Sequence, residues 1–370
     1  MKKLLIASAV SAALAAPTVA LAQAARAPTL GQVLDASGIS VNGYIDAGYS
    51  HADKNIEAGI GTPAVAPRVF DNQNNSFALH QFGLSVSKLP KQGFGGLVNV
   101  TVGSDAQVIH SFPDTSASLF DITQAYAQYS GGPLTLIAGK FATLQGTEVI
   151  WSPSNANVSR SILFGAIPFT HTGVRATWAV TDTVSLIGGV NNGWDQLTDQ
   201  NRGKTLELGA TLNPIKPLNI AISGYSGQEP AGTGNGTRTS INAVGSYNIT
   251  DAISVGAELL NVTQDVPGAG GATTSVKYTG VAGYGSYMFT SKIRGALRVE
   301  NFDDKDGFHF HTTGTKYREV TATGAYLASD SFEARAELRR DQGTNAVFRD
   351  FNGTTSKTLT TIAVQGLYKF

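Results

Sequence analysis

The chain has 370 residues, no formal net charge at neutral pH and no cysteine. Without a basic excess nucleic acid is not an expected partner, and without thiols the chain can form no disulfide, zinc–thiolate site or cysteine nucleophile. It contains 42 glycines, 17 phenylalanines and 12 tyrosines, yet only 42% of its residues are hydrophobic and its mean hydropathy is −0.03.

Residues 1–22 read as a cleavable export signal. The basic pair Lys2 and Lys3 precedes an apolar run over 4–16, and the triplet at 20–22 is Ala-Leu-Ala, as at a cleavage site. A membrane-spanning helix is the alternative, but the run is too short and too rich in alanine and serine. Its removal leaves about two more acidic than basic residues. The mature chain has no apolar run of helix-spanning length, so it could cross a membrane only as a closed barrel.

Residues 23–37 would follow the signal as a periplasmic segment. Leu30 and Val33 have helical spacing, which predicts a short helix within 29–36. This helix would plug the periplasmic mouth or rest in the lumen, and a disordered leader is the alternative. The remaining residues, 38–370, are expected to form one transmembrane barrel.

Strand candidates recur as segments of about ten residues in which apolar and polar residues alternate. The clearest is 332–340, where an apolar face alternates with glutamates and arginines. A soluble β-sandwich also alternates, but its apolar face must be covered by a second sheet. The expected strand centres are residues 45, 82, 98, 125, 137, 176, 188, 207, 221, 243, 257, 282, 297, 322, 335 and 364.

Tight turns alternate with longer polar loops along the chain. Seven tight turns are expected at 88–93, 130–133, 180–183, 213–217, 248–252, 289–292 and 328–331. Eight loops are expected at 52–75, 105–118, 142–170, 195–202, 228–236, 265–272, 304–315 and 342–356. This alternation of short turns and long loops predicts an all-β fold. The fold is expected to be a transmembrane antiparallel up-and-down barrel of about sixteen strands, with long extracellular loops and short periplasmic turns. A barrel of that size leaves an aqueous channel.

The last ten residues, TIAVQGLYKF, have the pattern of a closing strand. Tyr368 and Phe370 end its apolar face, where an interfacial aromatic girdle belongs, while Gln365 and Lys369 lie on the other face. With the export signal and the strand count, this ending resembles bacterial outer-membrane porins and their barrel-assembly signal. The segments TLGQVLDASGISVNGYIDAGYS and FDITQAYAQYSGGPLTLIAGKF resemble the putative β-barrel porin-2 (OmpL-like) family.

This resemblance implies location in the outer membrane of a Gram-negative bacterium. The implied partners are outer-membrane lipid and lipopolysaccharide, the barrel-assembly machinery and small hydrophilic solutes, and a homotrimer is preferred over a monomer. No cofactor is expected. Porins fold their third loop into the lumen, which would place residues 142–170 at the narrowest point of the channel.

The loop 142–170 is also too apolar to extend into solvent, which independently favours packing against the barrel interior. A lid over the rim is the alternative. Glu148 and Arg160 would face a charged wall, and the wall candidates are Arg175, Arg294, Arg298, Arg335, Arg339, Glu207, Glu258, Glu300, Glu333 and Glu337. Opposed rings of charge would sort solutes by charge. Alternatively, these residues only neutralise one another across neighbouring strands.

No Ser nucleophile motif accompanies the six histidines, so an enzyme is not expected. Asp303, Asp304 and Asp306 are weak candidates for a metal site, because their spacing departs from the EF-hand pattern. His309 and His311 would share a face if that segment were extended, but solvated loop residues are the preferred interpretation. The expected function is passive diffusion of small hydrophilic solutes and ions. A substrate-specific channel for sugars or small anions, or an adhesin barrel without transport, are the alternatives.

Overall fold

The computed structural model describes residues 29–56, 68–231, 234–312 and 314–370. The expected export signal, 1–22, lies outside these residues. The chain divides into two units, 1–37 and 38–370, and the described part of the first is helix α1 (Leu30–Ser37). Gly38 follows this helix with φ at +69°, a left-handed conformation that glycine adopts without strain. No helix among the described residues is long and apolar enough to cross a membrane.

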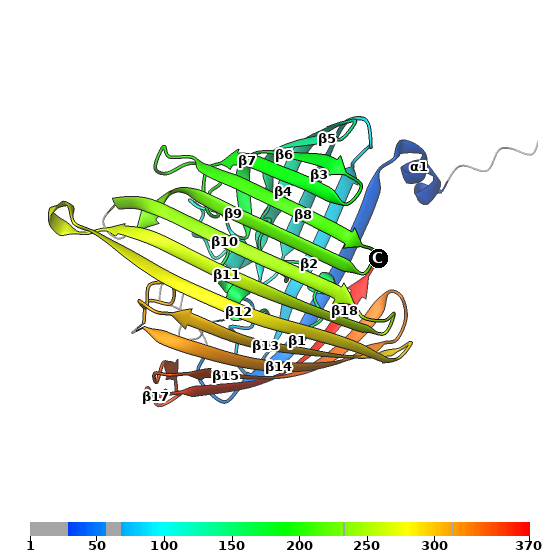
Figure 1. Ribbon diagram of the computed structural model, residues 1–370. Helices are drawn as coiled ribbons and strands as arrows, with labels where there is room; N and C mark the ends of the chain where they lie inside the picture. The colour runs from blue at the N-terminus through cyan, green and yellow to red at the C-terminus, as the bar shows by residue number, and fades with distance from the viewer. Residues whose placement is uncertain (1–28, 57–67, 232–233, 313) are drawn as a thin grey trace, which may run out of the picture. The chain divides into compact units, whose positions relative to one another are not determined.

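Each of the sixteen expected centres lies in a strand of the second unit (Figure 1). The strands are β1 (Ser40–Ala52), β2 (Ser76–Lys88), β3 (Gly93–Val102), β4 (Phe120–Gly131), β5 (Leu134–Ala142), β6 (Thr170–Thr181), β7 (Val184–Asn191), β8 (Thr205–Ile215), β9 (Leu218–Ala231), β10 (Gly234–Asn248), β11 (Ile253–Pro267), β12 (Thr273–Thr290), β13 (Ile293–Asp304), β14 (Thr315–Leu327), β15 (Phe332–Gly343) and β18 (Thr358–Lys369). The described parts of the loops contain short elements: α2 (Ala106–Ile109), η1 (Ser152–Ser154), α3 (Ile162–Gly165), η2 (Ala269–Gly271), β16 (Phe348–Arg349) and β17 (Thr355–Ser356).

The strands form a closed antiparallel barrel in which each pairs with its neighbours in the sequence and β18 pairs with both β15 and β1. At the seam Tyr44 lies opposite Lys369, and Gly43 and Phe370 exchange two backbone hydrogen bonds of 2.9 Å. The expected sixteen-strand fold is therefore confirmed. The short turns gather at the end that holds the C-terminus (Figure 1).

Side chains alternate between two environments along each strand, as the sequence pattern requires. On β15, Glu333, Arg335, Glu337 and Arg339 are buried on the inner face, whereas Leu338 between them is 53% exposed on the outer face. The strands therefore enclose a polar interior within an apolar outer surface.

Two expected loops, 228–236 and 265–272, are shorter than predicted. The β9–β10 ladder continues to the pair Ala231–Gly234, and the β11–β12 ladder continues to Pro267–Thr273. The predicted strands ended where the alternation of apolar and polar residues ends. Backbone hydrogen bonds between strands do not need apolar side chains, so polar segments can extend the ladder beyond that point.

The seam generates a prediction about barrel closure. The ring of Phe370 covers Gly43, where a Cβ would come within 2.4 Å of it, and stacks near Phe82 at a centroid distance of 6.3 Å. Phe370→Ala should lower the free energy of unfolding by about 1–2 kcal/mol, because the aromatic contacts with Phe82 and Tyr368 are lost. Urea titration of the protein folded into lipid vesicles would measure this. Phe289→Ala, at the same end but away from the seam, is the control, and an equal loss in both variants would contradict a special role for the seam.

Candidate constriction site

The loop between β5 and β6, residues 143–169 and here called L3, is hydrogen-bonded to inward-facing side chains of the barrel wall. The Gly146 amide donates to Asn242 at 3.1 Å, and the Asn157 side chain donates to Thr323 at 2.7 Å. The Thr147 amide donates to Glu258 at 2.8 Å. Asn242 and Glu258 lie in the interior of their strands, away from both ends. L3 therefore lies well inside the barrel.

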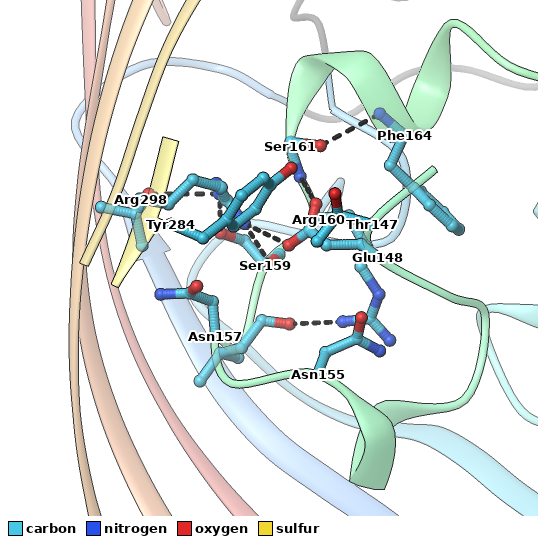
Figure 2. Close-up of polar contacts among 12 residues, drawn as sticks. Thr147, Glu148, Asn155, Asn157, Ser159, Arg160, Ser161, Phe164, Tyr284 and Arg298 are labelled. Atoms are coloured by element: carbon cyan, nitrogen blue, oxygen red, sulfur yellow. Dashed lines mark hydrogen bonds and ion pairs between the residues drawn. The ribbon is translucent and has the colours of Figure 1, made fainter. Parts of the chain in front are cut away.

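Arg298 on β13 connects L3 to the wall (Figure 2). One guanidinium nitrogen donates to Glu148 at 2.7 Å and to the Ser159 carbonyl at 2.8 Å. Its Nε donates to Glu319 on β14 at 3.1 Å. Since Arg298 is fully buried, its charge must be balanced locally. One side chain thus holds both arms of L3 against two strands.

Two wall glutamates bind L3 through backbone N–H groups. Glu337 accepts from Val158 at 2.6 Å and Ser159 at 2.9 Å. Glu300 accepts from the amides of residues 162 and 163 at 2.8 and 2.7 Å. These two amides open α3, where N–H groups have no partner within the helix. The Ser161 hydroxyl caps the same turn by accepting from the Phe164 amide at 3.0 Å.

Arg160, which the sequence analysis expects to face a charged wall, donates its side-chain hydrogen bonds to groups of L3. Its guanidinium donates to the carbonyls of Val149 and Ile150, each at 2.9 Å, and to that of Val158 at 3.0 Å. It also lies 5.4 Å from the ring centroid of Phe70. The five donors of a guanidinium suit a site where several carbonyls converge. Arg160 therefore braces L3 internally.

On the wall formed by β2 and β3, L3 is held by neutral polar side chains. Gln81 on β2 donates to the Ile150 carbonyl at 2.9 Å and accepts from Tyr44 at 2.5 Å. Trp151 donates to Asn99 on β3 at 2.9 Å. The ring of Tyr44 passes over Gly83, where a Cβ would come within 2.3 Å of it.

The apolar part of L3 packs against an apolar region of the inner wall. Ile162 and Leu163 are fully buried in one cluster with Tyr278 and Phe302, which come from β12 and β13. The Tyr278 hydroxyl also donates to the Ala166 carbonyl at 3.1 Å. Burial of these side chains removes apolar surface from water and adds to the polar anchors.

Segments of the first two loops pack onto L3. The ring centroids of Phe70 and Phe164 lie 5.6 Å apart, and both residues belong to a buried cluster with Ile109 of α2. Arg68 forms ion pairs with Asp71 and with Asp341 on β15. Several loops therefore fill the same part of the lumen.

The remaining predicted wall charges are paired. Arg175 donates to Glu207 at 2.5 Å and lies 4.3 Å from the Phe141 ring centroid. The other arginines form ion pairs within the wall: Arg294 with Glu333 at 2.5 Å, Arg335 with Glu333 at 2.7 Å, and Arg339 with Asp341 at 3.0 Å. Arg339 also donates to the Arg160 carbonyl at 2.6 Å. This geometry corresponds to mutual neutralisation for these charges.

Sequence reasoning missed several anchors. Glu319 and Asp341 complete the ion pairs of Arg298 and Arg339, and both lie on the polar face of an alternating strand. Their position on that face could have identified them as inward-facing residues. Tyr44, Gln81 and Asn99 carried no such signal, because neutral polar residues occur on many inward faces.

The candidate metal residues bind other groups. Asp303 pairs with Lys316 at 2.9 Å, Asp304 accepts two backbone N–H groups of its own loop, and Asp306 accepts one from β12. Over the residues that the structure describes, no cluster of three or more His, Cys, Asp or Glu side chains could hold a metal ion.

The two nearby histidines lie in turns, so they do not have the extended arrangement considered from the sequence. The ring of His309 packs 4.8 Å from that of Tyr278. Burial lowers the pKa of His309 to about 3, so it is neutral at physiological pH. His311 has a left-handed φ of +53°.

The ionisation of Glu148 depends on its arginine partners. Burial alone would raise the pKa of this carboxyl, but the charges of Arg298 and Arg160 outweigh burial and hold the pKa below its usual value. Glu148 is therefore ionised at neutral pH and can balance the buried charge of Arg298.

Comparison with known proteins gives a family match over the barrel. The family described as putative beta-barrel porin-2, OmpL-like, matches residues 38–370. No curated protein sequence matches the chain.

Solved structures share the fold at low identity. The outer-membrane channel DcaP of Acinetobacter baumannii is 13% identical, with a TM-score of 0.64 over 90% of this chain and 97% of that one. An anion-selective porin from Comamonas acidovorans is 11% identical, with a TM-score of 0.64 over 90% and 99%. The trimer form of OmpT from Vibrio cholerae is 11% identical, with a TM-score of 0.62 over 90% and 99%. At these identities the likeness concerns the fold alone.

The anchoring of L3 generates a prediction for Arg298→Gln. Removing this guanidinium leaves Glu148 and Glu319 buried without their partner, which costs about 3–5 kcal/mol. Hydrogen exchange of amides 147–161 should therefore accelerate by about a hundredfold or more. Arg294→Gln is the control, because it removes the same charge from a residue that pairs with Glu333 of the wall rather than with L3. Equal exchange in both variants would show that L3 is held by other contacts.

A second prediction concerns acid. Because the folded-state pKa of Glu148 is lowered, its stabilising contribution is present above the ordinary value of 4.5 and is lost as pH falls through the folded value. The difference in single-channel conductance between the wild type and Glu148→Gln, which cannot titrate, should stay constant from about pH 8 to 5 and change only in stronger acid. A change in this difference that starts near neutral pH would contradict the assignment.

Proposed function

The chain belongs to the putative beta-barrel porin-2, OmpL-like family, and on this premise we propose that it is a passive diffusion channel for small hydrophilic solutes and ions whose aperture is set by L3. An outer-membrane porin of this kind needs no cofactor and no covalent chemistry. The single observation that carries the proposal is the attachment of L3 to inward-facing residues deep inside the barrel, through Glu258, Arg298 and Glu337.

The distribution of these anchors suggests where solutes pass. Among the described residues, the hydrogen bonds between L3 and the strands of the barrel wall involve β2, β3 and β9–β15, and none involves β4–β8. The inner face of β4–β8 carries half-buried neutral polar residues such as Gln128, Thr177 and Thr211. We therefore place the pore between L3 and the wall formed by β4–β8. In this arrangement Glu148 and the paired wall charges, such as Arg175 and Arg339, border or support the constriction.

A substrate-specific channel is the second candidate function, because an aromatic-lined cavity lies on the long-loop side of L3. Planar-bilayer recording separates the candidates. An ohmic open channel supports general diffusion, whereas saturable block by one solute supports specificity. An adhesin barrel without transport would be silent in both measurements.

We extend the proposal to location and assembly. The N-terminal pattern supports export through a cleaved signal, and the terminal Tyr368 and Phe370 support recognition by the barrel-assembly machinery. Outer-membrane lipid and lipopolysaccharide would surround the apolar outer face. A homotrimer is proposed because one fold relative, OmpT, is described in a trimer form, and native mass spectrometry showing only monomer would refute it.

The proposal predicts the effect of shortening L3. Replacing residues 148–161 with a Gly-Ser-Gly link should raise single-channel conductance several-fold, because the segment that crosses the lumen is gone. The barrel should still fold, since its backbone ladder closes through β1 and β18 without L3. Planar-bilayer conductance and a heat-modifiable gel shift would measure the two properties.

The matched control shortens the turn of the β16–β17 hairpin, residues 350–354, in the last loop. This variant should fold with unchanged conductance. If the L3 variant folds and its conductance also stays unchanged, L3 does not set the aperture.

A further inference from the structure

A cavity of about 370 Å³ lies at the long-loop end of the barrel. Its lining includes Ala166 and Ile167 of L3, Trp194 and Gln196 of the loop after β7, and Arg238 of β10. Because L3 lies deeper in the barrel, a solute that enters from the long-loop side reaches this cavity before L3. Its volume is at the small end of the range of small-molecule sites.

Aromatic side chains form much of the cavity wall. Trp194, Tyr278 and Phe308 come from three separate segments and line the same space. The guanidinium of Arg238 lies 4.7 Å from the Trp194 ring centroid. This contact limits the orientation of the charged group without neutralising it.

The cavity lining also contains polar groups without partners. The indole Nε1 of Trp194 and Oε1 of Gln196 are buried and have no hydrogen-bond partner among the described residues. Such groups are costly unless something else satisfies them. Arg238 uses only Nε, which donates to Gln264 at 2.6 Å, and forms no ion pair within the described part of the chain.

Two carboxyl groups of the lining also have an oxygen that can still form a hydrogen bond. Glu229 accepts from the Trp194 amide at 3.1 Å and from Thr205 at 3.0 Å, both through Oε1. Asp195 accepts two backbone N–H groups through Oδ1. For both residues the second oxygen has no hydrogen bond to any described residue. The cavity therefore offers unused donors and unused acceptors side by side.

We propose that this cavity binds a neutral polyhydroxylated solute of monosaccharide size before the solute passes L3. Hydroxyl groups both donate and accept, so they can satisfy Trp194 and Arg238 on one side and Gln196 and Glu229 on the other. The apolar C–H faces of such a ring can pack on the aromatic walls. This inference rests on the proposed channel function and names the class of solute that the channel selects.

Charged solutes of the same size fit the lining less well. A carboxylate would meet Arg238 but would be repelled by Asp195, which is ionised at neutral pH although burial raises its pKa to about 6. An ammonium group would be repelled by Arg238. In a partly buried site, an unmatched charge loses hydration that the lining does not replace. A neutral polyol avoids both penalties.

The test uses D-glucose as the neutral probe, with gluconate and glucosamine as anionic and cationic probes of similar size. Tryptophan fluorescence of the detergent-solubilised protein is titrated with each probe, and single-channel current is recorded separately. Since the chain has 3 tryptophans, a Trp194→Phe variant identifies the signal of the cavity.

We expect a saturable fluorescence change with glucose that is lost in Trp194→Phe and is about tenfold weaker in affinity for both charged probes. Glu229→Gln keeps the Oε1 acceptor but replaces the free oxygen, so it should weaken glucose affinity about tenfold. Asp199→Asn is the matched control, because Asp199 pairs with Lys204 and does not line the cavity. It should leave glucose affinity unchanged.

The outcomes separate this inference from the proposed function. Ohmic conductance without a saturable glucose signal overturns the sugar site and leaves the channel intact. A charged probe that binds as tightly as glucose overturns the assigned solute class. A saturable, Glu229-dependent glucose signal supports the site even in a silent bilayer, and that silence would overturn the channel instead.

Discussion

The hydrogen-bonding requirement of the backbone determines the rest of this structure. In a lipid environment every strand N–H and C=O needs a partner, so the sheet has to close on itself. Closure is achieved where β18 lies between β1 and β15, with the final residue, Phe370, bonded to Gly43. A closed barrel of sixteen strands is too wide for its own inward side chains to fill. The content of the lumen is therefore decided by loops, and chiefly by L3.

L3 is held by charges that are removed from water. Burying Arg298 is costly unless its partners are positioned accurately, and Glu148, Glu319 and the Ser159 carbonyl supply them. Such a network fixes one loop position, because a displaced loop would leave the same charges buried and unpaired. The chain has no cysteine, so these ion pairs, and not a disulfide, hold the loop in place.

The strands could be predicted from the sequence because lipid outside and polar contacts inside impose a period of two on each of them, as the alternation from Phe332 to Arg339 shows. Turn chemistry located the short connections for a similar reason. The inner contacts could not be predicted in this way, because they depend on the path of a long loop. Arg160 was expected to face charged wall residues, yet its guanidinium donates to carbonyls of L3 itself. The cavity beside Trp194 and Arg238 was missed because its residues come from several loops and no local pattern connects them.

The internal bracing by Arg160 has a consequence for how L3 could move. Its guanidinium joins residues 149, 150 and 158 within the loop, and these bonds do not depend on the wall. If the wall contacts break, the arms of L3 remain joined and the segment moves as one body rather than unravelling residue by residue. A plug that moves as a unit has few stable positions. Fluctuations of this channel would then be recorded as discrete current levels with abrupt transitions, whereas a loose loop would produce a continuous spread of noise.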